Sequence, residues 1–281
     1  MLELHCHTTY SDGTLTPAAL VQAAVESGVR ALAITDHDTL AGWDEAIAAA
    51  RPHNIEIIPG VELSTVWGDR SLHLLGFYPN PAQLTPLLQD HIAGRQRRAQ
   101  QMRDKLAALG YAVTLPELGE GMAAGRLHLA SALVKAGYVQ TAQEAFERFL
   151  GDDGPAYVQY DKFLATDGVR RLRECGAVPV WAHPFLFRGG PIEATLTQLI
   201  HAGLMGVEVY HPSHTPNQVQ QLEAWCDRHA LLKTGGSDYH GPGESLEQPH
   251  RLNRLHLPLH LLTPLQQAAR CLAGGTRQQG S

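Results

Sequence analysis

Seven short apolar runs alternate with stretches of helical character, and this alternation constrains the fold more than any other feature of the chain. The runs cover residues 2–7, 29–35, 55–63, 71–78, 177–183, 206–211 and 230–237. Short strands that alternate with helices are typical of an α/β fold with a largely parallel sheet. Glycines such as Gly28 and Gly203 close several of the helical stretches, as expected for helix C-termini.

The strand pattern lapses between residues 78 and 177, where the sequence becomes helical. We therefore interpret residues 83–160 as a small helical insertion domain within the α/β domain. This divides the chain into a first part of the α/β domain (1–82), the insertion, and a second part (161–281). The 281 residues, 44% of them hydrophobic, suffice for a sizeable core.

Composition and charge exclude several classes of protein. The formal net charge of -6 argues against a general polyanion binder, whose basic surface would dominate the sum. Four widely spaced cysteines favour neither a disulfide framework nor a thiolate zinc site. No run approaches the roughly 20 apolar residues that cross a bilayer, and no secretion signal precedes the first strand. We expect a cytoplasmic protein with no membrane association and no stable protein partner.

Histidines and carboxylates recur where the predicted strands end. His5 and His7 share one face of the first strand, whereas Cys6 points into packing. The other such residues are Asp12, His37, Glu62, His73, His183, Asp238 and His240. One of these signals alone fits a packed or surface histidine equally well. Together they predict metal, because unpaired ionisable groups are costly to bury and α/β sites form at carboxyl strand ends. Nine residues are too many for one ion, which usually takes three protein ligands, so we expect two or three.

Six motifs along the chain resemble, in their order, those of the PHP (polymerase and histidinol phosphatase) superfamily. They are HCHTTYSDG, TDHD, GVE, LHLLGF, AHP and SDYHG. The resemblance implies a distorted (β/α)7 barrel that hydrolyses phosphate esters with three divalent ions, manganese first, with iron or zinc as alternatives. It implies one ion on His5, His7, Glu62 and Asp238, a second on Glu62, His73 and His183, and a third on Asp12, His37 and His240. Asp36 and Asp38 are expected to orient ligands or cap a helix.

Charge supports phosphate chemistry, since three divalent ions would bring six positive charges against the three carboxylates Asp12, Glu62 and Asp238. We expect direct attack by a metal-bridging hydroxide without a phospho-enzyme. The expected catalytic residues are Asp12, Glu62 and His211. His211 and His214 follow a strand and could protonate a leaving oxygen, although an ordinary surface loop explains them equally well.

Basic residues in the insertion suggest a second anion site. Residues 86–135 hold seven Lys or Arg against four Asp or Glu. Arg95 and Arg98 lie three apart and would share a helix face. Arg126 and His128 begin a helical run, where free N–H groups and the dipole favour an anion. The alternative is that these basic residues form a solvated face.

The patterns RxxRxxxMxxKL and GRxHxA in this segment resemble the family branch that removes the 3'-phosphate from nucleoside 3',5'-bisphosphates. We therefore expect a phosphatase that releases nucleoside 5'-monophosphate and phosphate from a small nucleotide, held by Arg95, Arg98, Arg126 and His128. Other activities stay open: a 5'-phosphate-dependent exoribonuclease on short RNA, a histidinol-phosphate-type phosphatase, or a non-catalytic barrel that retains metal.

Overall fold

The computed structural model describes residues 1–118, 122–159, 163–242 and 251–275. These residues form one seven-stranded sheet whose strands follow each other in chain order. The strands are β1 (Leu2–Glu3), β2 (Ala31–Ile34), β3 (Glu56–Trp67), β4 (Arg70–Phe77), β5 (Val178–Trp181), β6 (Gly206–Tyr210) and β7 (Leu232–Gly235). All seven predicted strands are therefore present.

The sheet curls into a nearly closed barrel. Beyond β1 the chain continues alongside β7, where Leu4 N donates to Gly235 O at 3.2 Å and His7 N donates to Tyr239 O at 2.8 Å. This contact brings the first and last strands of the sheet together. The expected α/β barrel of PHP type is confirmed.

The largely parallel sheet is confirmed, but the predicted first strand is too long and the direction of β4 was not predicted. The first strand ends at Glu3 rather than at residue 7, because residues 4–7 follow β7 without a regular ladder. Strand β4 runs antiparallel to both β3 and β5, whereas the other four described pairs are parallel. The reversal follows from a tight turn between β3 and β4, in which Gly68 has a φ of +59°.

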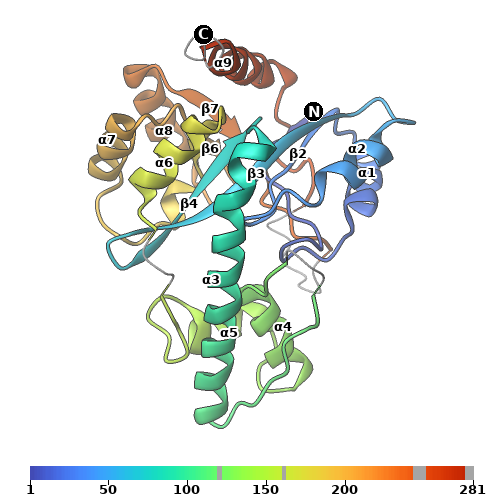
Figure 1. The fold of residues 1–281 in the computed structure, drawn as a ribbon, viewed down its shortest axis with the longest axis vertical. Helices are drawn as coiled ribbons and strands as arrows, with labels where there is room; N and C mark the ends of the chain where they lie inside the picture. The colour runs from blue at the N-terminus through green and yellow to red at the C-terminus, as the bar shows by residue number, and fades with distance from the viewer. Residues whose placement is uncertain (119–121, 160–162, 243–250, 276–281) are drawn as a thin grey trace.

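Helices pack around the barrel on both sides (Figure 1). They are α1 (Pro17–Glu26), α2 (Trp43–Ala50), α6 (Ala165–Glu174), α7 (Ile192–Ala202), α8 (Pro216–His229) and α9 (Leu262–Gly275), with short 3-10 turns at Pro184–Leu186 and Leu259–Leu261. Apolar residues such as Leu20 of α1 and Trp43 of α2 pack against Ile34 of β2. Leu172 of α6 and Leu196 of α7 belong to another buried cluster, on the β3–β6 side.

A helical lobe lies between β4 and α6 in the chain. It contains α3 (Pro81–Ala108), α4 (Arg126–Lys135), α5 (Ala142–Ala145) and a π-helical turn, η1 (Phe146–Leu150). Figure 1 shows α3 extending from the barrel down into this lobe. Leu84 and Leu88 of α3 pack in the barrel core, whereas Met102 and Leu106 pack in a separate apolar cluster of the lobe. Helix α3 thus joins the two cores, and the domain boundaries 1–82, 83–160 and 161–281 stay a prediction.

None of the helices in the described part of the chain combines the length and the apolar character that crossing a membrane requires.

Candidate metal centre

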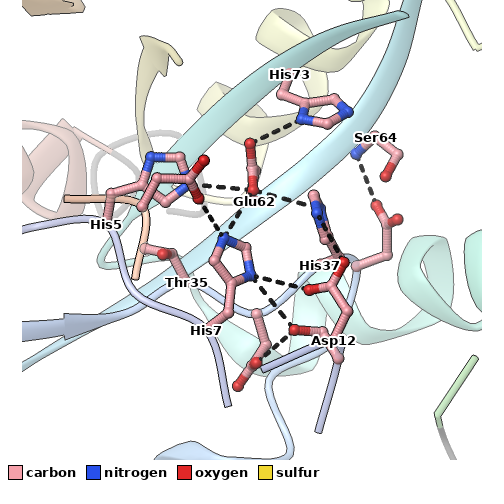
Figure 2. Close-up of polar contacts among 12 residues, drawn as sticks. His5, His7, Asp12, Thr35, His37, Glu62, Ser64 and His73 are labelled. Atoms are coloured by element: carbon pink, nitrogen blue, oxygen red, sulfur yellow. Dashed lines mark hydrogen bonds and ion pairs between the residues drawn. The ribbon is translucent and has the colours of Figure 1, made fainter. Parts of the chain in front are cut away.

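Glu62 lies at the centre of a ring of imidazoles at one end of the barrel (Figure 2). Its Oε2 is 3.1 Å from Nε2 of both His5 and His7. Its Oε1 is 2.8 Å from His73 Nδ1 and 3.0 Å from His183 Nε2. Glu62, His5 and His7 are buried, with 1%, 0% and 0% exposure. Residues far apart in the sequence therefore converge on one carboxylate.

The pairing of β3 with β4 explains how His73 reaches this ring. Glu62 pairs with Leu75 and Ser64 pairs with His73, so His73 is the diagonal neighbour of Glu62 on the same face. Because β4 is antiparallel, His73 lies in its first half and not at its carboxyl end. The expectation that ligands sit at carboxyl strand ends is therefore wrong for this residue, although it joins the same cluster.

Among the described residues, three sets of side chains each hold ligand atoms within 4.8 Å of one another. They are His5, His7, Glu62 and Asp238; His37, Glu62 and His73; and His7, Asp12, His37 and His240. His7, His37 and Glu62 each belong to two sets, so the sets adjoin. These buried groups are suited to a polynuclear metal site. His183 is outside these three sets, but contacts Glu62.

The orientation of these groups fits metal ions. Within the described structure, five ligand atoms of the cluster are buried and make no hydrogen bond of normal geometry. They are His5 Nε2, His7 Nε2, His37 Nδ1, His73 Nε2 and Asp12 Oδ1. Several of them lie close to a carboxylate oxygen, but their N–H vectors are not aligned with it. Buried polar atoms without partners are costly, and imidazole nitrogen with carboxylate oxygen is a donor set for divalent ions. The residues present therefore fit such ions.

The electrostatics of the cluster favour a bound cation. Burial opposes charge on Glu62, but His37 and His5 keep its pKa well below the usual value. Burial also opposes charge on His7, yet the carboxylates of Asp238 and Glu62, each 3.1 Å from its Nε2, raise its pKa to about 10. The carboxylates thus stay ionised and hold a proton on His7, and a metal ion that binds there would displace that proton.

Buried carboxylates outside the ring support the loops that carry it. Asp36 accepts hydrogen bonds from Thr8 N, Thr8 Oγ1 and Ser11 Oγ at 2.7, 2.7 and 2.6 Å. Asp38 accepts from Ser64 N at 2.8 Å and lies 3.2 Å from both His91 Nδ1 and Arg95 Nη1. These contacts agree with an orienting role for the two aspartates.

Two buried glutamates were not predicted from the sequence. Glu208 Oε1 is 2.9 Å from His5 Nδ1, and its Oε2 accepts from His183 N at 2.7 Å. Glu3 accepts from Ser237 N and Asn253 N, at 2.8 and 2.7 Å. A lone glutamate inside an apolar strand, as in LELH and VEVY, is the signal that could have revealed both, because buried glutamates need partners.

His211 is buried next to the cluster, with 2% exposure. Its Nε2 is 3.7 Å from Asp238 Oδ2, and its Nδ1 is 2.7 Å from Ser213 Oγ. His214 is also buried, and its Nδ1–H donates to Val209 O at 2.9 Å. The surface-loop interpretation of these two histidines is therefore wrong, and of the two it is His211 that contacts a candidate ligand.

The two arginines of α3 are buried, so the solvated-face interpretation is wrong for them. Arg95 Nη1 donates to Ser64 Oγ at 2.9 Å and to Asp38 Oδ2 at 3.2 Å, on the barrel side. Arg98 Nε donates to Val158 O at 2.6 Å, and its guanidinium lies 5.3 Å from the ring centre of Tyr157. The two side chains contact different parts of the protein.

The first turn of α4 faces the cluster. A Cβ at Gly125 would lie 3.2 Å from Asp12 Oδ2 and 3.0 Å from Arg95 Nη2, so this helix start packs directly against the site. Gly125 N donates to His128 Nδ1 at 3.0 Å, and burial lowers the pKa of His128. Arg126 lines the same cavity as His37, His73, His183 and His240.

Arg126 is held at the cavity wall by an ion pair and by aromatic rings. Its Nη1 is 2.8 Å from Asp152 Oδ1. Its guanidinium lies 5.5 Å from the ring centre of Phe146 and 5.8 Å from that of Tyr157. The side chain is 20% exposed, unlike those of the two α3 arginines. A partly exposed cation thus lines the same cavity as the histidines.

Comparisons with known proteins agree with this geometry. The family model for the PHP domain matches residues 3–147. A Haemophilus influenzae protein named 5'-3' exoribonuclease is 36% identical over 250 residues, which cover 85% of this chain and 90% of the relative. A 3',5'-nucleoside bisphosphate phosphatase of Chromobacterium violaceum is 34% identical over 256 residues, covering 86% of this chain and 88% of the relative.

Among solved structures, a candidate metal-dependent phosphoesterase of Bifidobacterium adolescentis superposes with a TM-score of 0.85 at 32% identity. The match covers 95% of this chain and 96% of that one. Family model, relatives and fold thus agree with the cluster of buried metal-binding groups. The chain belongs to the PHP domain family of metal-dependent phosphoesterases.

Proposed function

We propose that this phosphoesterase is a phosphoric monoester hydrolase that converts nucleoside 3',5'-bisphosphates to nucleoside 5'-monophosphate and phosphate. The observation that carries the proposal is the position of Arg126 in the same cavity as the imidazole cluster. One phosphate can then be hydrolysed at the cluster while a second is held at the wall. The name of the Chromobacterium violaceum relative supports this substrate.

The proposed metal centre uses the nine histidines and carboxylates predicted from the sequence. One ion would be held by His5, His7, Glu62 and Asp238, a second by Glu62, His73 and His183, and a third by Asp12, His37 and His240. Manganese is proposed, with iron and zinc as alternatives. Bound ions of this kind supply Lewis-acid stabilisation of phosphoryl charge and lower the pKa of water.

The side chains of the protein determine which nucleophile is available. Cys6 is buried, and burial raises the pKa of its thiol well above the usual value. Cys175 and Cys226 are also buried, with raised thiol pKa values. None of these three cysteines is therefore a suitable thiolate nucleophile, and the fourth, Cys271, is exposed on α9 and does not line the cavity. We propose that water attacks the phosphate directly and that no phospho-enzyme forms.

His211 is the proposed general acid. Its Nδ1 is fixed against Ser213 Oγ, so its Nε2 is directed toward Asp238. A proton on this Nε2 can pass to the leaving 3'-oxygen, which a nucleoside alcohol needs because an alkoxide is a poor leaving group. Asp12 and Glu62 stay ionised under the influence of the surrounding histidines, which suits catalytic metal ligands.

The start of α4 is the proposed site of the 5'-phosphate. Arg126 and the N–H groups of the first turn supply positive charge and donors, and His128 lies in the same turn. Arg95 reaches toward Gly125 and adds a buried positive charge. Arg98 is proposed to shape this wall through Tyr157 rather than by contacting the phosphate.

A 5'-phosphate-dependent exoribonuclease on short RNA is the second candidate, favoured by the name of the 36% identical relative. It would use the same wall to hold a 5'-phosphate. The net charge of -6 favours contact with a few nucleotides over a long polyanion.

Substrate comparison tests the proposal. We would measure manganese-dependent phosphate release from adenosine 3',5'-bisphosphate, 3'-AMP, 5'-AMP and histidinol phosphate, and nucleotide release from a short 5'-phosphorylated RNA. We expect kcat/KM for the bisphosphate to exceed that for 3'-AMP by about tenfold or more, the value of one charge-assisted hydrogen bond. Preference for the RNA would establish the second candidate, and preference for histidinol phosphate would contradict a second phosphate site.

A further inference from the structure

Glu208 is a fully buried carboxylate inside β6 that is not a candidate metal ligand. Its exposure is 0%, and its neighbours Val207 and Val209 belong to the barrel core. An ionised carboxylate in such a place is costly unless hydrogen bonds compensate it.

The two oxygens of Glu208 contact two different ligand-bearing segments. Oε1 lies 2.9 Å from His5 Nδ1, in the segment that follows β1. Oε2 accepts a hydrogen bond from His183 N at 2.7 Å, where β5 has just ended. One side chain therefore joins His5, which lies 3.1 Å from Glu62 Oε2, to His183, which lies 3.0 Å from Glu62 Oε1.

The contact with His183 stabilises an unusual backbone. His183 has φ 32° and ψ 61°, in the left-handed region that is unfavourable for a residue other than glycine. In this conformation its imidazole Nε2 reaches Glu62 Oε1 at 3.0 Å. The hydrogen bond to Glu208 holds the backbone N–H at the point where the chain turns.

The contact with His5 selects a tautomer. Glu208 accepts from His183 N with one oxygen and lies 2.9 Å from His5 Nδ1 with the other, so His5 Nδ1 is the ring nitrogen placed to donate a proton to the carboxylate. In the neutral ring, Nε2 is then the unprotonated nitrogen. That atom lies 3.1 Å from Glu62 Oε2 and 3.3 Å from Asp238 Oδ1, where a shared cation would be coordinated.

We infer that Glu208 is a positioning residue of the metal centre, which fixes His5 as an Nε2 ligand and His183 in its left-handed conformation. Through these two contacts it couples neighbouring ion positions. Carboxylates that accept from a ligating histidine raise metal affinity, commonly by 10–100-fold. The inference rests on the proposed metal centre and is independent of which phosphate ester is the substrate.

The test is metal binding by Glu208→Gln. The glutamine carbonyl can still accept from His183 N, but its NH₂ then faces His5 Nδ1 and favours the tautomer protonated on Nε2. We expect manganese affinity to fall by about 10–100-fold. Equilibrium dialysis against graded Mn²⁺, with elemental analysis of the protein, would give affinity and stoichiometry. Circular dichroism and thermal unfolding of the metal-free variant would confirm that it is folded.

The matched control is Glu223→Gln, because Glu223 accepts a hydrogen bond from Tyr210 Oη at 2.8 Å at the end of the same strand and does not belong to the cluster. Its manganese affinity should equal that of the wild type. A folded Glu208→Gln that binds manganese like the wild type would overturn the inference. If the wild-type protein binds no divalent ion, the proposed metal centre itself is wrong.

If Glu208→Gln does not fold, a second measurement tests whether His5 is held as an Nε2 ligand. Wild-type protein with ¹⁵N-labelled histidine and bound diamagnetic Zn²⁺ would be studied by long-range ¹H–¹⁵N spectra, with the His5 signal identified by its loss in His5→Gln. We expect a protonated Nδ1 and a metal-bound Nε2 for His5. The reverse assignment would overturn the inference.

Discussion

Arg126 is the most exposed of the three arginines that the sequence predicts to bind the substrate, and its contacts indicate what its removal would do. Its guanidinium is 20% exposed at the cavity wall, whereas Arg95 and Arg98 are 4% and 6% exposed. We expect Arg126→Ala to raise KM for adenosine 3',5'-bisphosphate by about 10–100-fold, as for the loss of a charge-assisted hydrogen bond of about 1.5–3 kcal/mol. KM for 3'-AMP should stay nearly unchanged in the same steady-state assay.

Arg148→Ala provides the control for this prediction. Arg148 lies in the same helical turn as Phe146 and pairs with Glu144, but is 43% exposed and does not line the cavity. The Arg148→Ala variant should have wild-type KM values for both nucleotides. If Arg126→Ala affected the bisphosphate and 3'-AMP equally, Arg126 would not bind the 5'-phosphate.

His211 and its neighbour His214 differ in what their side chains can reach. His211 Nε2 points toward Asp238, whereas His214 Nδ1 is bound to Val209 O. We expect His211→Asn to lower kcat for nucleotides by about 10²–10⁴-fold, the usual contribution of a general acid. The loss should be much smaller for 4-nitrophenyl phosphate, whose leaving group needs no proton.

The sensitivity to the leaving group distinguishes chemistry from structure. His214→Asn, measured at the same metal content, should lower both activities by a similar factor if it lowers them at all. A loss in His211→Asn that is equal for the two substrates would argue that His211 only supports the fold near Asp238.

At the residue scale, the sequence predicted which side chains form the metal-binding cluster. It did not predict which other side chains hydrogen-bond to the cluster and hold it in place. Most of the nine candidate ligands were recognisable because acid or imidazole recurs at the ends of successive predicted strands. Glu208 was not, because its partner His5 lies 203 positions away and only the closed barrel brings the two together. The acceptors of Arg95 and Arg98 were unpredictable for the same reason, since the packing of α3 selects them.

At the element scale, α3 is fastened to the barrel by a buried cluster of polar contacts. His91 and Arg95, one turn apart on α3, both contact Asp38, which directly follows His37. Asp38 has a φ of 54°, and its carboxylate also accepts from Ser64 N on β3. These contacts connect the helical lobe to the strand ends that carry the cluster.

We expect Asp38→Ala to lower the free energy of unfolding by about 3–5 kcal/mol, because it removes the carboxylate that compensates the buried charge of Arg95. Urea unfolding of the metal-free protein would measure this. Asp104→Ala is the control on the same helix, since Asp104 is 66% exposed and pairs with Arg103 at the surface. Its effect should be below about 1 kcal/mol. Equal stability of the two variants would contradict the role of Asp38.

The strands themselves were predictable from short apolar runs, but their directions were not. An apolar run looks the same in a parallel and an antiparallel strand, and only the tight turn at Gly68 and Asp69 distinguishes β4 from the others. The first strand was predicted too long because His5 and His7 alternate with Cys6 as in a strand. In the structure these residues keep that alternation while their backbone follows β7 irregularly.

At the scale of the whole molecule, we expect the fold to form without bound metal. Separate apolar clusters hold the barrel, its helices and the lobe together. We expect a chelator to abolish phosphatase activity and leave the circular dichroism spectrum unchanged. Manganese at about 100 times its dissociation constant should then stabilise the protein by about 2.7 kcal/mol through binding to the native state alone.

Thermal unfolding at graded Mn²⁺ concentrations measures this stabilisation. A shift of the midpoint by several degrees is expected for a chain of this size. The variant Glu62→Gln, which loses the central carboxylate of two of the three sets, should show a much smaller shift. A wild-type midpoint that is independent of manganese would contradict the proposed centre.

The order in which the cluster residues occur along the chain has a consequence for synthesis in the cell. Six candidate ligands leave the ribosome early, namely His5, His7, Asp12, His37, Glu62 and His73. The other three follow more than a hundred residues later, namely His183, Asp238 and His240. The barrel also closes only when the segment after β7 pairs with residues 4–7. We therefore expect a nascent chain to carry the proposed metal centre in an incomplete form, and hydrolytic activity to begin only after Asp238 and His240 have left the ribosome.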